Sequence, residues 1–502
     1  MEYTYDNPDC LWIQADAFDG GTGTFEKPFA SLESALERVK PGQAIVLQAG
    51  EYPGDCNIQV SGTAAEPIRI VAMPGAEVVI RSACWFFYDT SDLIVEGMSF
   101  VDAPRGAISV VGACSRNRFD GIRFVNCSSR GESACTLYIG GAGGVCNLIE
   151  NCTFVRSVDA AGTSESKEDG SIGLMVAQGD MEHDSPIVNC LVRRNRVENY
   201  GYGIVVGGDG SRRTRCGHII EYNRIVNASC EGILVKSGDT RIRSNVIEHG
   251  TGTALSLRSE LDGTVDGNRI VDCRRGVFVH GTGHSVAGNC IVRCSEGAVR
   301  VGGASDEDSG TTLNCFIENN TFVDCGASGG GDENRIAGVL VDRGTTGLIQ
   351  RNLITGTGKP YAVVTSTPEQ TGETATQFVI KDNIAAGGCE ALDGVGAVEV
   401  VFADAAGGDY SNESGCGAGG WVLKPQGYDP AADTGDDEGV YRAASMLEDE
   451  SGNPIIPGSE AGTNDGLFGN YYASDGGDGE DPDDDDDEDE ESVMSTGDDE
   501  EW

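Results

Sequence analysis

Residues 220–225 read IEYNRI, residues 242–247 read IRSNVI and residues 265–270 read VDGNRI. Each hexapeptide has an apolar residue at both ends and an asparagine in fourth place. The pattern returns at residues 192–197, 286–291, 317–322 and 349–354. Its central asparagines, Asn223, Asn245, Asn268 and Asn289, are 22, 23 and 21 residues apart. Such a period is typical of proteins in which one small structural unit stacks on the next.

The repeat predicts an all-β fold. Apolar residues alternate with polar ones on either side of each asparagine, as expected for short strands with one buried face. We expect the asparagine to sit at a bend, in or near the left-handed αL conformation, and to hydrogen-bond to its counterpart on the next coil. The 73 glycines and 7% aromatic content suit many short strands joined by tight turns. The sequence therefore predicts a right-handed parallel β-helix with three sheets and a ladder of asparagines.

The chain divides into four predicted segments. Ser31 is the expected N-cap of a helix that covers the first coil, and Pro41-Gly42 ends it. After about Asn383 the repeat fades, and from Asp475 the chain is nearly all Asp, Glu, Gly and Ser, which cannot bury enough apolar surface to fold. The predicted segments are an N-terminal cap (1–44, with helix 31–40), the β-helix (45–400), an irregular C-terminal cap (401–474) and a disordered acidic tail (475–502).

The charge balance limits the partners. A formal charge of −46 opposes binding to nucleic acid or to anionic membranes, and no apolar run of about 18 residues predicts a membrane span. Arginine supplies most of the basic residues, and this acidic composition is typical of salt-loving organisms. No signal peptide is visible at the start, so an extracellular or cell-surface location is expected from function alone and a cytoplasmic one stays open. We expect a monomer.

Several of the 18 cysteines recur at one phase of the repeat. Cys273, Cys294 and Cys325 each follow a ladder asparagine by five residues, and Cys127 holds the same phase in an earlier coil. Neighbouring coils about 4.8 Å apart would permit a disulfide between Cys273 and Cys294. Reduced thiols in the core are the preferred interpretation, and ligand spacing disfavours a zinc site.

The strand that follows the cysteine phase carries the candidate site. Residues 232–236, 254–258, 276–280 and 298–302 have apolar residues at their second and fourth positions, which should point inward. Lys236, Arg258 and His280 are then stacked on one outer face at intervals of 22 residues, with Arg300 one row away. Ordinary solvated side chains are the alternative interpretation.

A row of cations on an acidic protein indicates an anionic ligand. Removing the α-proton of a uronic acid requires a neutralised carboxylate, a base on the proton and a donor for the departing 4-oxygen. A lysine beside an arginine has a lowered pKa, as a general base needs. Lys236 is the expected base, and Arg258 would stabilise the enolate and help to protonate the leaving oxygen.

Three short motifs strengthen this hypothesis. EGILVKS at residues 231–237, ALSLR at 254–258 and GTGH at 281–284 resemble the catalytic coils of polysaccharide lyase family six, the chondroitinase B and alginate lyase group with a pectin lyase-like β-helix. Residues 19–75, including Lys27-Pro28-Phe29, are similar to the family as well, though many β-helix proteins begin this way. The resemblance covers most of residues 15–300.

The resemblance implies roles for individual residues. Lys236 falls on the family's base and Arg258 on its acid. The family's calcium is held by two glutamates one residue apart and an upstream asparagine, which implies Glu231 and Asn199 as ligands. The chain departs from the family at Ser229, where the other glutamate would stand, and at Ser259, where a histidine would follow the arginine.

These observations rank three functions. The first is a polysaccharide lyase that cleaves an acidic, uronate-containing polymer by β-elimination, with Arg212, Arg213, Arg215, His280 and Arg300 as substrate-binding residues. The second is a non-catalytic carbohydrate-binding or surface protein that uses the same face. A β-helix glycoside hydrolase ranks third, because it needs clustered outward carboxylates and the central coils show none at a shared phase.

Overall fold

The computed structural model describes most of the chain up to residue 397. The described residues are 3–4, 7–18, 20–128, 135–141, 143–157, 170–177, 186–208, 212–302, 312–326, 337–342, 345–356, 361–364, 377–386, 395–397, 447–448 and 454–455. The predicted irregular cap lies outside these residues apart from the last two pairs, and the predicted acidic tail lies wholly outside them. The chain splits into two units, Met1–Ser445 and Met446–Trp502.

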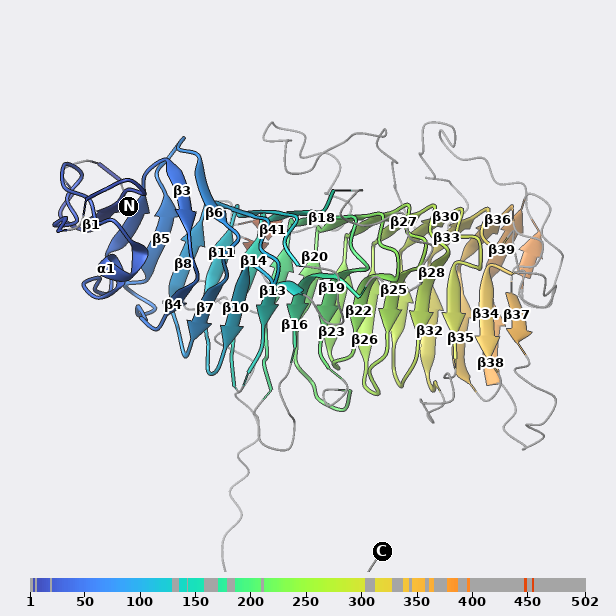
Figure 1. Cartoon of the computed structure of the whole chain (residues 1–502). Helices are drawn as coiled ribbons and strands as arrows, with labels where there is room; N and C mark the ends of the chain where they lie inside the picture. Colours follow the sequence, from blue (N-terminus) through green and yellow to red (C-terminus); the bar gives the residue numbers. More distant parts are fainter. Residues whose placement is uncertain are drawn as a thin grey trace, which may run out of the picture. The chain divides into compact units, whose positions relative to one another are not determined.

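The first unit is a parallel β-helix, and its coils follow one another along a single axis (Figure 1). Among the described residues each full coil contributes one strand to each of three parallel sheets, which we number in the order in which the chain visits them. Sheet 1 consists of β1 (Cys10–Ile13), β2 (Ala44–Leu47), β5 (Ile68–Ala72), β8 (Leu93–Glu96), β11 (Arg118–Asp120), β14 (Leu148–Glu150), β17 (Leu191–Arg193), β20 (Ile219–Glu221), β23 (Thr240–Arg243), β26 (Gly263–Asp266), β29 (Ser285–Ala287), β32 (Cys315–Glu318), β35 (Thr346–Gln350) and β38 (Gln377–Lys381).

Sheet 2 consists of β3 (Gly50–Pro53), β6 (Val78–Arg81), β9 (Ser99–Val101), β12 (Arg123–Val125), β15 (Thr153–Val155), β18 (Arg196–Glu198), β21 (Arg224–Val226), β24 (Val246–Glu248), β27 (Arg269–Val271), β30 (Cys290–Val292), β33 (Thr321–Val323), β36 (Leu353–Thr355), β39 (Asn383–Ala386) and β40 (Val395–Ala397). Sheet 3 consists of β4 (Cys56–Ile58), β7 (Trp85–Tyr88), β10 (Ile108–Val111), β13 (Cys135–Ile139), β16 (Ile172–Val176), β19 (Tyr202–Val206), β22 (Glu231–Val235), β25 (Thr253–Leu257), β28 (Arg275–Val279), β31 (Val299–Val301), β34 (Val339–Asp342) and β37 (Tyr361–Val364). In the second unit, β41 (Leu447–Glu448) pairs antiparallel with β42 (Pro454–Ile455).

The N-terminal helix is shorter than predicted. Helix α1 spans Leu32–Leu36, with Ser31 as its N-cap: the backbone N–H of Ser34 donates to the Ser31 hydroxyl over 3.3 Å. Leu32, Ala35 and Leu36 are buried, and α1 contacts β1, β2 and β4 of the first coil. The sequence prediction extended the helix to residue 40, but the chain leaves the helix after one turn and a half.

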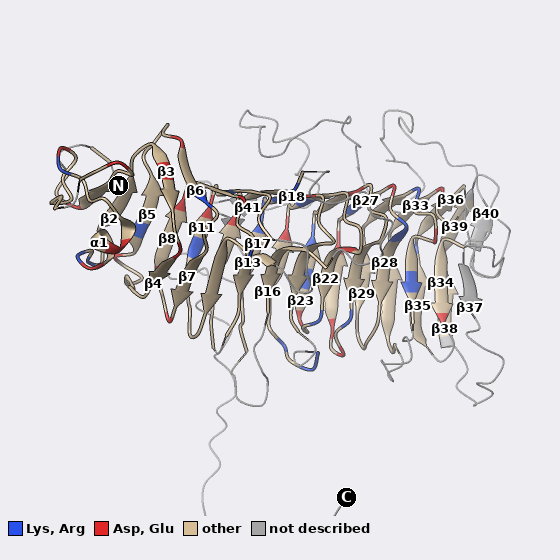
Figure 2. Ribbon diagram, in the orientation of Figure 1, with Lys and Arg blue, Asp and Glu red and all other residues tan. Residues whose placement is uncertain are grey.

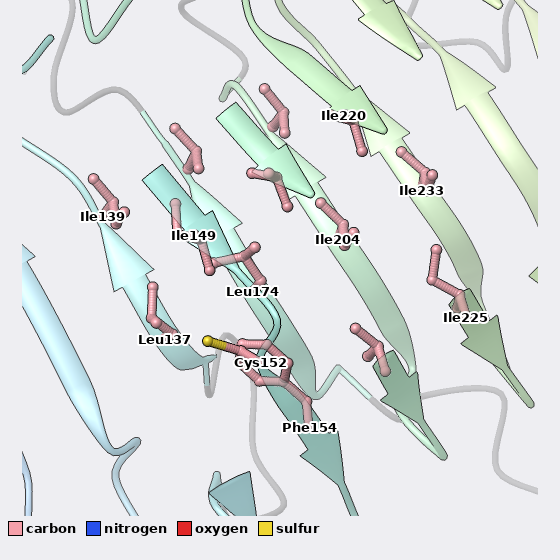
Figure 3. Packing of buried hydrophobic residues seen from close by; sticks show 14 of the residues in the cluster. Leu137, Ile139, Ile149, Cys152, Phe154, Leu174, Ile204, Ile220, Ile225 and Ile233 are labelled. Atoms are coloured by element: carbon pink, nitrogen blue, oxygen red, sulfur yellow. The ribbon is translucent and has the colours of Figure 1, made fainter. Parts of the chain in front are cut away.

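Inward side chains from all three sheets form one continuous core. Figure 3 shows isoleucines and leucines of successive coils stacked in rows, with Cys152 and Phe154 beside them. The rings of Phe100, Phe124 and Phe154 stack in register on sheet 2, with centroids 5.6 and 4.6 Å apart. Similar apolar side chains of successive coils therefore pack on one another along the axis, as in a close-packed core.

The predicted asparagine ladder is confirmed. The Asn223 side chain accepts from Asn195, and Asn223 in turn donates its Nδ2–H to the Oδ1 of Asn245 over 3.0 Å; the contact repeats between Asn245 and Asn268 and between Asn268 and Asn289. One detail of the prediction is wrong. The αL conformation belongs to the residue before each asparagine, for example Tyr222 (φ 54°) and Ser244 (φ 54°), and this frees the asparagine to point inward.

The described cysteines are free thiols, and all but Cys135 and Cys230 are buried. Cys294 and Cys325 lie in neighbouring coils within the core, as predicted, and their thiols donate to backbone carbonyls of their own coils and, for Cys325, of the coil before. Burial raises the pKa of Cys273 to about 12. These thiols therefore behave as core side chains and not as nucleophiles or metal ligands.

Candidate functional site

The outer face of sheet 3 is a grid of three rows. Strands β19, β22, β25 and β28 pair in register, so their first, fourth and following residues lie side by side. The first row holds Tyr202, Glu231, Thr253 and Arg275. The middle row holds Val205, Leu234, Ser256, Phe278, Arg300 and Leu340. The last row, directly after the strands, holds Gly207, Lys236, Arg258, His280 and Gly302, and Asp342 at the end of β34 continues it.

Lys236 and Arg258 occupy neighbouring positions of the last row, as predicted. The backbone N–H of Lys236 donates to the carbonyl of Val206 over 2.8 Å, and that of Arg258 donates to Val235 over 2.7 Å. These bonds continue the ladder of sheet 3 by one residue beyond each strand. The two cationic side chains therefore start one coil apart on a rigid sheet, about 4.8 Å from each other at the backbone.

The guanidinium of Arg258 is held by Glu231 and Phe278, and Ser256 supports Glu231. Its Nη2 forms an ion pair with Oε1 of Glu231, and the same oxygen accepts a hydrogen bond of 2.9 Å from Ser256. The guanidinium also lies over the ring of Phe278, 5.6 Å from its centroid, where a cation is attracted by the ring face. Arg258 is thus fixed in orientation while 35% of its side chain stays exposed.

Glu231 is an unusual carboxyl group. It is buried, with 6% of its surface exposed, and burial raises its pKa although Arg258, Ser256 and Lys236 favour the ionised form. Its second oxygen, Oε2, has no hydrogen-bond partner among the described residues. A buried polar atom without a partner is rare, and it commonly marks a place where a ligand or water binds.

The prediction that His280 faces solvent is wrong. His280 lies in the last row next to Arg258, as expected, but only 4% of its surface is exposed. Gly302 follows it in the row, and a Cβ added there would lie 2.3 Å from the Cβ of Asp342, so the next coil approaches closely at this point. The Nδ1 of the buried His280 ring has no partner among the described residues.

Arg300 lies in the middle row, one row from His280, as predicted. Its Nη2 is 3.2 Å from Oδ2 of Asp342. Phe278 precedes it in the row, so Arg300 continues the polar part of the face towards the C-terminal coils.

The predicted loop arginines form ion pairs with the turn after β25. Arg213 pairs with Glu260 over 2.6 Å and Arg215 with Asp262 over 2.6 Å, while the carbonyl of Arg212 accepts from the backbone N–H of Glu260. A sugar carboxylate would have to displace Glu260 or Asp262 to reach Arg213 or Arg215. Their role in substrate binding stays a prediction.

The donors implied for calcium are engaged elsewhere. Asn199 donates to the carbonyl of Arg156 over 2.8 Å and accepts from Asn227 over 2.9 Å, and Glu231 is paired with Arg258. Calcium takes six to eight oxygen ligands, whereas no group of three or more acidic, histidine or cysteine side chains suited to a metal exists among the described residues. Oε2 of Glu231 has no partner among the described residues, and calcium binding stays a prediction that chelation tests.

Sequence reasoning missed four residues of this face. Tyr202 and Thr253 flank Glu231 in the first row. Arg275 follows them and donates to Thr253 over 3.3 Å and to Glu296 over 2.8 Å, and Phe278 supports Arg258. Phe278 stands at the third position of segment 276–280, which was expected to point outward. Tyr202, Thr253 and Arg275 were missed because the outward residue stands one place before the expected first position, and Ala254, at that expected position, lies in the core.

Comparisons with known proteins agree with the fold. Residues 181–354 match the model of the right handed beta helix region. A pectate lyase of Emericella nidulans, PEL9, is 33% identical over 72 residues, which is 14% of this chain and 18% of that protein. The uncharacterized protein YwoF of Bacillus subtilis is 26% identical over 104 residues, or 19% of this chain and 22% of that protein. The chain thus spans about a fifth of the curated relatives it matches.

Solved structures resemble the whole β-helix. The family-six alginate lyase AlyGC superposes with a TM-score of 0.61 at 18% identity, covering 88% of this chain and 59% of AlyGC. A mannuronic acid specific family-six lyase from human gut microbiota superposes with a TM-score of 0.54 at 19% identity, covering 74% and 88% of the two chains. The chain is therefore a right-handed parallel β-helix protein that shares its fold with the family-six polysaccharide lyases.

Proposed function

We propose that the protein is a polysaccharide lyase that cleaves a uronate-containing polymer by β-elimination at Lys236 and Arg258. The observation that carries the proposal is the position of these two cations in neighbouring coils of the last row. The fold supports it, because it is shared with alginate lyases of family six. Both residues directly follow inner strands of sheet 3, and backbone hydrogen bonds fix their positions. Such positions keep catalytic groups in place better than a loop does.

The proposed reaction has two parts. Lys236 removes the α-proton next to the sugar carboxylate, and the negative charge that develops on that carboxylate is stabilised by Arg258. The bond to the 4-oxygen then breaks as a carbon–carbon double bond forms. Arg258 helps to protonate the departing 4-oxygen and regains its proton from solvent, while Lys236 releases the α-proton to solvent. Glu231 and Phe278 hold the Arg258 guanidinium so that it need not reorganise during the reaction.

The spacing of Glu231 and Asp342, the carboxylates that pair with Arg258 and Arg300, does not suit a glycoside hydrolase. Glu231 and Asp342 lie on strands β22 and β34, four coils apart, which corresponds to roughly 19 Å at about 4.8 Å per coil. Hydrolases place their two carboxyl groups about 5–9.5 Å apart.

The assignment is tested by incubating the protein in high salt with alginate, pectate, chondroitin sulfate and dermatan sulfate. A lyase produces an unsaturated uronate, which absorbs in the ultraviolet, from at least one polymer. A rise in reducing ends without ultraviolet absorbance would indicate hydrolysis. Binding without any product would leave the non-catalytic carbohydrate-binding protein as the function.

A further inference from the structure

The outer face of sheet 3 changes character along the middle row. On the N-terminal side of Ser256 the row is apolar, with Val205 and Leu234 in a small buried cluster. On the C-terminal side it continues with Phe278 and Arg300. Along this row, an anionic chain that passes Lys236 and Arg258 therefore meets a described cation in the direction of the C-terminal coils.

Positive charge exceeds negative charge in this half of the face. Beyond Arg258 the described cations are Arg274, Arg275 and Arg300, and the described carboxylates that pair with them are Glu296 and Asp342. Among the described residues, three cations thus stand against two carboxylates. The chain as a whole carries a formal charge of −46, so a local surplus of positive charge indicates an anionic ligand.

The arginines beyond Arg258 share too few carboxylates. Glu296 serves two guanidinium groups, with Arg275 at 2.8 Å and Arg274 at 3.5 Å. Arg300 is paired with Asp342 at 3.2 Å. Burial lowers the pKa of Arg275, and the charges of Arg300 and Arg274 lower it further while Glu296 opposes them. Three close guanidinium groups are held by two carboxylates.

Arg275 and Arg300 are partly exposed beside Phe278, with 17% and 20% of their side chains open to solvent. Both make their protein ion pairs through Nη2. Guanidinium groups bind carboxylates through paired N–H donors. An incoming carboxylate can therefore approach both arginines from the solvent side.

We propose that Arg275 and Arg300, beside Phe278, form a carboxylate-binding subsite that takes a second uronate of the polymer, one to two coils beyond Arg258 towards the C-terminus. The inference rests on the proposed lyase function and names what its substrate must carry. The subsite requires a further carboxylated sugar on one side of the bond that is cut, and it gives no advantage to a neutral sugar there. Phe278 supplies an apolar surface against which a sugar ring can lie.

The test measures binding apart from turnover, in the Lys236→Ala protein so that the ligand survives. Oligogalacturonate and oligomannuronate are titrated by calorimetry at fixed salt, each beside its counterpart with the carboxylates reduced to alcohols. Adding Arg300→Gln or Arg275→Gln should weaken binding about tenfold or more for whichever acidic oligomer binds more tightly, as the loss of a charge-assisted contact predicts. Binding of the reduced oligomer should not change.

Two variants control the result. Arg243→Gln removes an arginine that pairs with Glu221 at 2.7 Å on sheet 1, away from the proposed subsite, and should leave binding as it was. Arg300→Lys keeps the charge without the fork and should bind at an intermediate strength. Thermal unfolding of each variant checks that the fold is intact.

The outcomes separate this subsite from the proposed function. Unchanged affinity in both Arg275→Gln and Arg300→Gln overturns the subsite, and so does an equal loss for the acidic and the reduced oligomers. Weakened acidic binding in a protein whose unmutated form produces no unsaturated uronate keeps the subsite and removes the lyase. Lyase activity with an unchanged KM in Arg300→Gln keeps the lyase and removes the subsite.

Discussion

At the scale of single residues, Arg258 is the best-defined member of the site. Glu231 and Phe278 fix its guanidinium, Ser256 supports Glu231, and a third of the side chain faces solvent. A lysine at this position keeps the charge but loses the planar fork that spans a carboxylate. Arg258→Lys should therefore lower kcat roughly 100-fold, as loss of a well-placed donor to developing negative charge does.

The control for Arg258→Lys is Arg243→Lys on sheet 1, which changes the same residue type in a comparable ion pair. Initial rates of ultraviolet absorbance compare the two proteins. Equal rates in wild type, Arg258→Lys and the control would show that the guanidinium has no role in the chemistry.

His218 gives a prediction about pH and stability. It is buried, its Nδ1 accepts the backbone N–H of Cys190 over 3.2 Å, and burial lowers its pKa to about 4. The unfolded chain, with an ordinary histidine pKa near 6.5, binds this proton more readily than the folded protein. The free energy of unfolding should therefore decrease as pH falls from about 6.5 to about 4.

The variant that isolates this effect is His218→Asn. Asn117 and Asn147 occupy the equivalent place before β11 and β14, where their Oδ1 atoms accept backbone N–H groups of the preceding coil. Asparagine at 218 should keep the hydrogen bond and remove the titration, so its stability should decline less than that of wild type over this interval. Denaturant unfolding at several pH values measures both curves, and curves with the same slope would refute the assignment.

At the scale of the strand and its turn, the features that recur in every coil were predictable from the sequence, and the contacts between particular coils were not. The apolar positions of residues 232–236 and 254–258 determined the inward face correctly, because side chains alternate along a strand. The burial of His280 was not predictable from its own coil. Its neighbours in the last row, Arg258 and Gly302, belong to other coils, so its surroundings follow only from how the coils stack. The same holds for the ion pair of Glu231 with Arg258.

The asparagine ladder is the element-scale feature with the clearest energetic consequence. Asn245 is completely buried; its Nδ2 donates to Ile220 and Asn268, and its Oδ1 accepts from Asn223. Asn245→Ala removes these bonds and leaves buried donors and acceptors unpaired, at about 1–3 kcal/mol each. We expect a loss of about 3 kcal/mol or more in the free energy of unfolding.

Thr264→Ala in β26 is the matched control, since Thr264 is exposed on the next coil, and surface changes of this kind stay within about 0.5 kcal/mol. Urea unfolding followed by circular dichroism gives both values. A ladder variant as stable as the control would mean that water replaces the lost hydrogen bonds.

At the scale of the whole molecule, arginines form ion pairs with many of the acidic residues along the β-helix. Figure 2 shows acidic and basic residues on successive strands of the β-helix. Glu150 lies between Arg118 and Arg193, each at 2.8 Å, and Glu248 pairs with both Arg224 and Arg269. Single carboxylates thus join arginines of neighbouring coils. No helix in the described part of the chain is long and apolar enough to span a membrane.

The acidic residues after Asp475 lie outside the described part, and their prediction rests on composition. A segment of Asp, Glu, Gly and Ser buries little apolar surface, so removing residues after Asp475 should leave the thermal midpoint essentially unchanged at matched salt. Differential scanning calorimetry of the full and truncated chains compares them. A midpoint lowered by several degrees would mean that the tail binds to the folded part.

The central claim is that Lys236 and Arg258 together perform a β-elimination. Its most direct test is the rate of ultraviolet absorbance with Lys236→Ala, on whichever polymer the wild-type protein cleaves. Turnover should be nearly abolished, while the thermal midpoint and the affinity for oligouronate should remain close to wild type, because the side chain lies outside the core. Wild-type turnover in Lys236→Ala would contradict the central claim.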